Sequence, residues 1–102
     1  MFNWEPPEFR PVKEDEVVCY AFAIANLPII PDRKVKIFLK YISGLEGYQG
    51  LYPHYPDGTL VIFKTENDAK AGRNLIRNYP GYSGGTGDNI GEVYINKQYL
   101  RG

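Results

Sequence analysis

Few side chains of this 102-residue chain have the types and the spacing that catalysis requires. A serine, threonine or cysteine nucleophile needs a neighbouring base that accepts its proton. The only histidine, His54, follows a proline in an aromatic run, and no nucleophile is identifiable as its partner. Two pairs of carboxylates occupy positions typical of turns, helix caps and surfaces: Asp57 with Glu66, and Asp88 with Glu92. The residues therefore predict no catalytic site, and we expect a protein that is not an enzyme.

The sequence also predicts neither a metal site nor a bound cofactor. His54 has no cysteine or second histidine nearby that could complete a set of metal ligands. The glycine-rich run 81–91 does not have the G-x-G-x-x-G spacing, because Ile90 follows Gly85 and Gly87 where a glycine is required. It also lies between a predicted helix and a predicted strand, so no helix N-terminus stands behind it to bind a phosphate. We interpret this run as a mobile connection.

The single cysteine, Cys19, bears on the compartment. It excludes an internal disulfide and lies in the apolar run 17–25, where a thiol is usually an unreactive core group. That run is about half as long as a membrane-spanning helix. The first residues do not show the basic and apolar pattern of a signal peptide. We therefore expect a soluble, cytoplasmic protein without a membrane partner.

Charged residues divide the chain into two parts. Acidic and basic residues are equal in number, at 12 each, so the net charge is zero. Residues 1–16 contain five carboxylates, two cations and three prolines, whereas residues 17–102 contain ten cations and seven carboxylates. Each proline fixes φ and removes a hydrogen-bond donor, so regular structure is not expected in the first part. We predict a proline-rich acidic arm over 1–16 and a single domain over 17–102.

Aromatic residues gather in the arm and in the run 47–56, and they are candidates for contact with a partner protein. Tyrosine and tryptophan anchor many interfaces because they bring a large area and a polar tip. The alternative is that they pack against the chain's own core. The candidate residues are Phe2, Trp4 and Phe9 in the arm, and Tyr48, Tyr52, His54 and Tyr55 in the run.

Six cations recur at i, i+3 and i+7 on the outward faces of two predicted helices. If the helices lie side by side, the two stripes could merge into one basic face that contacts phosphates or an acidic protein surface. The alternative is an ordinary solvated exterior. These residues are Arg33, Lys36 and Lys40 on the first helix, and Lys70, Arg73 and Arg77 on the second.

Hydrophobic periodicity and the residues that start and stop helices predict the strands and helices that position these groups. The apolar run 17–27 predicts a buried strand. Asp32 and Thr65 are predicted N-caps of two helices, which end at Gly44 and at Pro80. The remaining segments predict an irregular edge strand over 47–56, which contains Pro53, and regular strands over 59–63 and 92–100.

This order predicts an α+β fold of the ferredoxin-like class, a β-α-β-β-α-β two-layer sandwich with both helices on one face of an antiparallel sheet. Alternation along the strands directs Phe22, Ile24, Val61 and Phe63 toward the helices. The other sheet face then carries Cys19, Ala21, Ala23, Leu60 and Ile62. Such an apolar face usually marks an interaction surface. It could meet a second copy or another protein, or lie under the arm, and Leu60 and Ile62 are our candidate contacts there.

Two short stretches resemble the RNA-recognition motif, a family with this fold. Residues 22–28, FAIANLP, are similar to the family's first-strand motif, and residues 60–70, LVIFKTENDAK, to its third strand and second helix. The resemblance covers about residues 18–96 and implies the same fold. The family stacks bases on aromatic side chains of the first and third strands. Here Ala23, Gly58 and Leu60 stand at the matching positions and cannot stack a base, so the resemblance supports the fold more than RNA binding.

We therefore expect a non-enzymatic protein-interaction module that binds a protein partner or a second copy of itself. It would act as a small regulator, adaptor or inhibitor. Its short length and acidic arm are similar to small proteins of phages and mobile elements, some of which act on host nucleic-acid enzymes. The alternative is a nucleic-acid-binding domain, similar to the RNA-recognition motif, that uses the basic helical face.

Overall fold

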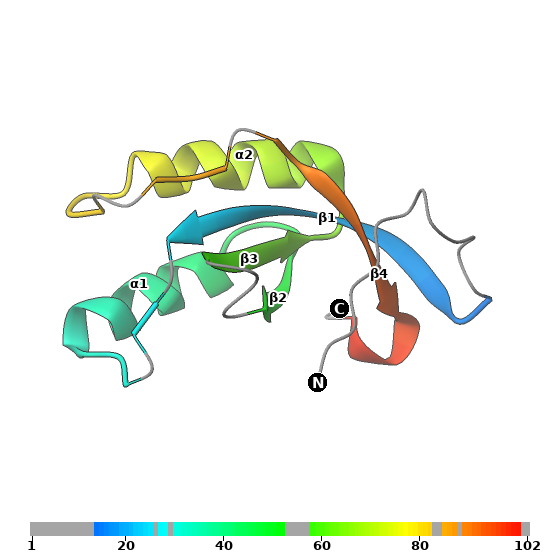
Figure 1. The fold of residues 1–102 in the computed structure, drawn as a ribbon, viewed down its shortest axis with the longest axis horizontal. Coiled ribbons are helices and arrows are strands. Elements are labelled where there is room, and N and C mark those ends of the chain that lie inside the picture. Colours follow the sequence, from blue (N-terminus) through cyan, green and yellow to red (C-terminus); the bar gives the residue numbers. More distant parts are fainter. Residues whose placement is uncertain are drawn as a thin grey trace.

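The computed structural model describes residues 14–25, 27–28, 30–52, 58–82, 85–87 and 89–100. Its elements, labelled in Figure 1, are the strands β1 (Glu16–Ala25), β2 (Tyr48–Tyr52), β3 (Gly58–Phe63) and β4 (Gly91–Asn96), the helices α1 (Arg33–Ser43) and α2 (Glu66–Arg77), and the 3-10 helix η2 (Lys97–Tyr99). The strands form one antiparallel sheet in the order β2-β3-β1-β4. The predicted α+β class, with a four-stranded antiparallel sheet and two helices, is confirmed, and the arrangement is compatible with a two-layer sandwich.

The long central strand β1 is the backbone of the sheet. It pairs with β3 from Tyr20 to Ala25 and with β4 from Glu16 to Ala21. The chain also pairs with β1 just before β4 begins, because Thr86 forms a bridge with Ile24 and the Gly87 amide donates to the Ala23 carbonyl at 2.7 Å. Part of the glycine-rich connection is therefore held against the end of β1.

Both helices begin at the caps that the sequence predicts. The Asp32 carboxylate accepts a hydrogen bond from the Val35 amide at 2.9 Å, and the Thr65 hydroxyl accepts one from the Asp68 amide at 3.1 Å. Gly44 caps the end of α1 as predicted, whereas α2 ends at Arg77 with Asn78 as its C-cap, just before the predicted stop at Pro80. Within the described residues, neither helix has the length and apolar character of a membrane-spanning segment.

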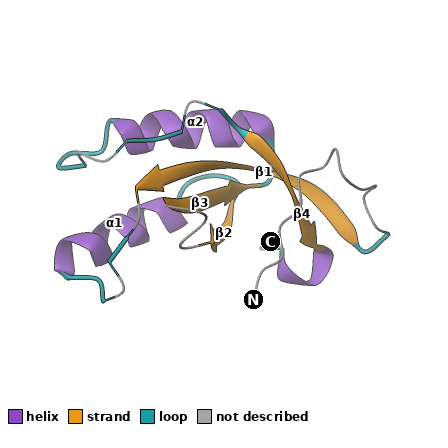
Figure 2. Cartoon of the chain, viewed as in Figure 1, coloured by secondary structure: helices purple, strands orange, loops and turns teal. Residues whose placement is uncertain are grey.

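The main core lies between the helices and one face of the sheet. Phe22, Ile24, Val61 and Phe63 point to this side, as predicted, and pack with buried residues of both helices. The Phe22 and Phe63 rings stack with centroids 5.7 Å apart. The α2 helix runs along β1 (Figure 2) because its small residues allow a close approach. At Gly72, the approach to the sheet is so close that the Phe63 ring of β3 occupies the space that a Cβ would need.

The opposite sheet face is apolar, as the alternation predicts. Its buried cluster consists of Cys19, Ala21, Leu60, Ile62, Val93 and Ile95. Leu60 and Ile62 are only 8% and 5% exposed within the single chain. The six side chains of this cluster are therefore buried within the single chain, although part of the face borders a hollow of about 300 Å³ lined by Ala21, Ala23 and Leu60.

Two strand predictions are corrected or refined by the structure. The strand predicted over 92–100 ends at Asn96, because the Asn96 side chain accepts a hydrogen bond from the Gln98 amide and starts η2. The irregular edge strand predicted over 47–56 is present as β2, over 48–52, and its register shifts between Tyr48 and Gly50. Residues 53–57, which include Pro53, lie outside the described residues.

Candidate functional site

A cluster of aromatic rings joins α1 to the segment that follows α2. The Phe38 ring stacks on the Tyr82 ring with centroids 5.2 Å apart, and the Tyr79 ring lies 4.9 Å from that of Phe38. Tyr79 also contacts Tyr41 at 4.8 Å. Gly81, at a φ of 87°, provides the left-handed turn between the two tyrosines of this segment. The cluster therefore fixes the end of α2 against the middle of α1.

The Tyr82 hydroxyl connects this cluster to the sheet. It donates to the Gly85 carbonyl at 2.8 Å and accepts a hydrogen bond from the Ala25 amide at 3.4 Å. Burial raises the pKa of the Tyr82 phenol above its ordinary value, although the Ala25 amide acts in the opposite direction. Tyr82 therefore stays neutral at physiological pH, and its role is structural.

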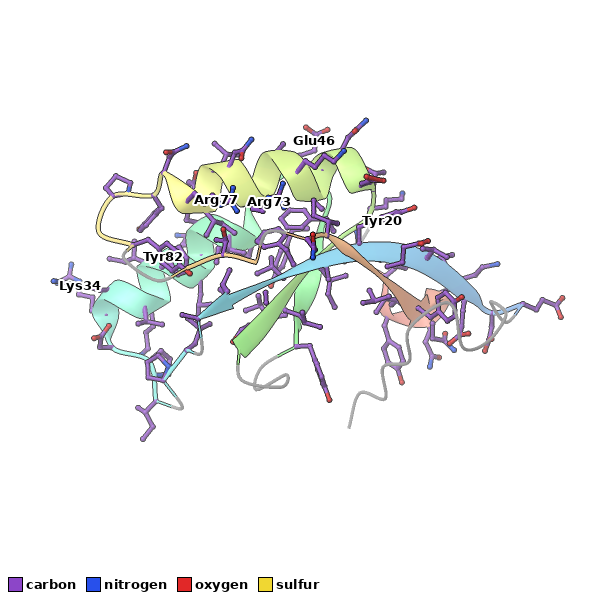
Figure 3. All side chains as sticks on the ribbon, turned by 45° about the horizontal axis from the view of Figure 1, so that its top comes forward. Tyr20, Lys34, Glu46, Arg73, Arg77 and Tyr82 are labelled. Carbon is purple, nitrogen blue, oxygen red and sulfur yellow. The ribbon has the colours of Figure 1, made fainter. Side chains whose placement is uncertain are left out.

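A hollow of about 600 Å³ opens beside these rings, between the first half of α1, the end of β1 and the segment after α2. Its lining includes Lys34, Ile37, Phe38, Tyr79 and Tyr82. The volume is within the range of ordinary ligand pockets, which are also mostly apolar with few polar groups. Figure 3 shows Lys34 and Tyr82 at the same end of the helical layer.

Large apolar side chains next to the hollow are exposed to solvent. Ile37 is 53% exposed, Leu75 is 48% exposed and Tyr41 is 36% exposed. Ile37 lines the hollow itself, Tyr41 contacts Tyr79 of its lining, and Leu75 lies on α2, four residues before Tyr79 in the sequence. We call Lys34, Ile37, Tyr41, Leu75, Tyr79 and Tyr82 the interhelical surface. Adjacent exposed apolar groups of this kind mark interaction sites more often than isolated ones.

The α1 helix gives one side of this surface a positive charge. Its eleven residues include four cations and no carboxylate: Arg33, Lys34, Lys36 and Lys40. Lys34 lines the hollow, whereas the other three are exposed elsewhere on the helix. Among the described residues, Lys34 forms no ion pair. A cation that borders an apolar hollow favours an anionic group on whatever enters it.

The predicted cations of α2 are engaged differently from those of α1. Lys70 forms an ion pair with Glu66 at 3.3 Å, and the Arg77 guanidinium donates to the Thr86 hydroxyl. Arg73 is half-buried, and Figure 3 shows Arg73 and Arg77 on the side of α2 that faces the strands. The structure therefore does not bring Arg73 and Arg77 next to the cations of α1, Arg33, Lys36 and Lys40. Phosphate binding by either group stays a prediction.

The predicted tyrosine cluster is divided between the two sheet faces. Tyr48 packs on the main core, where its ring meets the edge of Phe63 at 6.4 Å, whereas Tyr52 packs on the opposite cluster. Residues four apart on a regular strand share a face, but the register shift at Gly50 separates these two. The other predicted contact residues, Phe2, Trp4, Phe9, His54 and Tyr55, lie outside the described residues.

Sequence reasoning missed Ile37, Tyr41, Leu75 and Tyr82 as candidate contacts. A signal for two of them was present, because Ile37 and Tyr41 are four residues apart on the predicted helix and lie beside its inward apolar stripe. An apolar pair outside the stripe widens the apolar face beyond what one sheet can cover. No comparable signal existed for Tyr82, since its position depends on the turn after α2.

The described residues offer interaction chemistry and few reactive groups. No three histidine, cysteine, aspartate or glutamate side chains come together among them as a potential metal site. Burial raises the pKa of the Cys19 thiol, despite the nearby Lys64, so this thiol is neutral and weakly nucleophilic. Of the carboxylates considered above, Glu66 pairs with Lys70, and Asp57 and Asp88 lie outside the described residues. Comparison with protein-family models found no match, and neither did comparison with curated proteins or with solved structures.

Proposed function

We propose that this chain is a non-enzymatic protein-interaction module, a small regulator or adaptor, which docks a partner protein on its interhelical surface. The observation that carries this proposal is the exposure of Ile37, Tyr41 and Leu75 around an apolar hollow. A polypeptide that covers these side chains removes apolar area from water. Each gains about 1 kcal/mol on complete coverage, because full burial of a large apolar side chain contributes about 1.5–3 kcal/mol and each is already half-covered.

The rigid support of the surface adds to this argument. Interface residues contribute most when they are held in place before binding, because less side-chain freedom is then lost. Tyr41 is held by its contact with Tyr79, which in turn contacts Phe38 of the core. An aromatic group anchored in this way is typical of interface hot spots.

We further propose that the fold belongs to the ferredoxin-like class, with a distant similarity to the RNA-recognition motif. The strand order β2-β3-β1-β4 and the packing of both helices on one sheet face support this proposal. Nucleic-acid binding in the manner of that family receives less support. Gly58 and Leu60 are buried and Ala23 is half-buried, so no aromatic ring is presented at the matching positions.

Site-specific photo-cross-linking in the native host tests the proposed function. A photoreactive residue replaces Ile37 in one variant and Leu75 in another, while Ser43, exposed on a different side of α1, is the matched control position. We expect the same protein adduct from positions 37 and 75 and none from position 43. The adduct from position 75 should also disappear when Ile37→Glu is added.

Two results would contradict the proposal. One is equal cross-linking from all three positions, which would indicate random encounters. The other is an adduct from position 75 that persists in the Ile37→Glu variant, since a charge in the centre of an apolar interface must weaken it.

A further inference from the structure

Resting on the proposed function, we propose that the interhelical surface recognises an acidic segment of a partner protein, whose large apolar side chains enter the hollow and whose carboxylates face Lys34. This occupant is defined by chemistry that the surface itself displays. It is a peptide segment and not a small molecule, because further exposed apolar side chains, Tyr41 on α1 and Leu75 on α2, lie outside the hollow.

The shape of the hollow determines the apolar part of the segment. Its walls are the rings of Phe38, Tyr79 and Tyr82, and its volume of about 600 Å³ accommodates large side chains. The exposed groups outside it offer further apolar contacts. An amphipathic segment with several large apolar residues on one side fits both regions at once.

The charge of α1 determines the acidic part. Three of its four cations, Arg33, Lys34 and Lys36, lie in the first turn or just after it, at the positive end of the helix dipole. The first turn itself holds no carboxylate, so within α1 and its cap only Asp32 offsets these cations. A carboxylate supplied by a partner would compensate both the cations and the dipole.

The carboxylate next to these cations, Asp32 at the N-cap, compensates their charge only in part. Asp32 accepts a hydrogen bond from the Val35 amide as the N-cap, and Glu66 pairs with Lys70. Figure 3 shows Glu46 toward the opposite end of the helical layer from Lys34. Among the described residues, Lys34 at this end of the interhelical surface therefore has no ion-pair partner and can meet an external anion.

A second copy of the chain is a less suitable occupant. In a two-fold dimer the interhelical surface faces a second interhelical surface, whose named residues offer Lys34 no carboxylate. Two patches of like charge oppose association. An acidic segment meets no such repulsion.

Selection from an unbiased random peptide display library against the full chain tests this inference. We expect the selected peptides to be enriched in Asp and Glu between large apolar residues. Their Kd, measured by fluorescence polarisation, should rise about tenfold or more in Ile37→Glu, which corresponds to 1.4 kcal/mol. The Kd should rise about fivefold in Lys34→Glu. For the wild-type chain, the Kd should decrease as the salt concentration is lowered. Lys70→Glu, on the other helix, is the matched control and should leave Kd within about twofold.

Each other outcome overturns a defined part of the account. Peptides that depend on Ile37 but are not acidic, and that tolerate Lys34→Glu, would refute the acidic occupant and leave the proposed function intact. Peptides that bind the Ile37→Glu variant equally well, or a selection without binders, would refute both the acidic occupant and the proposed function.

A wild-type chain with twice the solution mass of Ile37→Glu would show that a second copy occupies the surface. Displacement of the peptides by an oligonucleotide at equal phosphate and carboxylate concentration would favour nucleic acid instead. Circular dichroism of each variant, with Ile37→Ser as a milder second substitution, separates lost binding from lost folding.

Discussion

At the scale of single residues, the contact between Phe63 and Gly72 decides how closely α2 approaches the sheet. A glycine inside a helix costs about 1 kcal/mol relative to alanine, so its presence needs a structural reason. The reason here is space, because a Cβ at position 72 would overlap the ring of Phe63, which is completely buried.

We predict that Gly72→Ala destabilises the chain by about 1–3 kcal/mol, since overpacking outweighs the gain in helix propensity. Urea unfolding followed by circular dichroism measures this change. Lys70→Ala, exposed on the same helix, is the control and should shift stability by less than about 0.5 kcal/mol. A Gly72→Ala chain more stable than the wild type would show that α2 does not pack this closely.

The Cys19 thiol and the Tyr82 phenol make the free energy of unfolding depend on pH in the alkaline range. Burial raises the pKa of the Cys19 thiol above its ordinary 9.0 and that of the Tyr82 phenol above its ordinary 10.0. The folded chain therefore holds these protons at pH values at which the unfolded chain has released them. Their contribution is fully present below about pH 9 and is lost as the pH rises through the folded-state pKa values.

We predict that the urea midpoint falls as the pH rises above about 9, and falls less steeply in the Tyr82→Phe variant, which lacks the half-buried Tyr82 phenol. Fluorescence-detected unfolding at closely spaced pH values measures both slopes. A midpoint that increases over this range, or an identical slope in Tyr82→Phe, would contradict the burial of these groups.

At the scale of elements, the local signals in the sequence predicted the helices well and the ends of the strands less well. Asp32 and Thr65 cap the helices as predicted because an N-cap depends on a few neighbouring residues. The end of β4 was placed too late because a side-chain hydrogen bond of Asn96 competes with the strand ladder. The division of Tyr48 from Tyr52 follows from a register shift that periodicity alone does not reveal.

The α1 helix connects stability with binding through its first turn. We predict that Lys34→Glu stabilises the free chain by about 0.3–1 kcal/mol, because a carboxylate there interacts favourably with the helix dipole, while it weakens binding of the acidic peptide. Lys40→Glu, in the last turn of the same helix, is the matched control and should lower stability by a similar amount. Thermal unfolding in low salt measures both changes. Stability changes of the same sign in Lys34→Glu and Lys40→Glu would mean that the helix dipole does not determine their effects.

At the scale of the whole molecule, the described part of the chain has two apolar surfaces besides its main core, and they differ in access to solvent. Sequence alternation correctly identified the sheet face with Leu60 and Ile62, which the structure shows to be buried. It did not identify the interhelical surface, because that surface is assembled from α1, α2 and the segment after α2, which meet only in three dimensions.

We predict opposite consequences for two isoleucines on these surfaces. Ile62→Ala should destabilise the chain by about 2–4 kcal/mol, because it opens a cavity among buried neighbours. Ile37→Ala should change stability by less than about 0.5 kcal/mol, since its side chain is largely exposed. Paired urea unfolding curves measure the difference, and comparable losses from the two substitutions would refute the distinction between the surfaces.

Methyl NMR spectra of the chain, recorded as the cross-linked partner or a selected peptide is added, test the docking proposal most directly. We predict that the largest shift changes arise at the methyl groups of Ile37 and Leu75, while those of Ile62 and Val93 hold their positions. Shifts concentrated at Ile62 and Val93, with Ile37 and Leu75 unchanged, would place the partner on the sheet face and contradict the account.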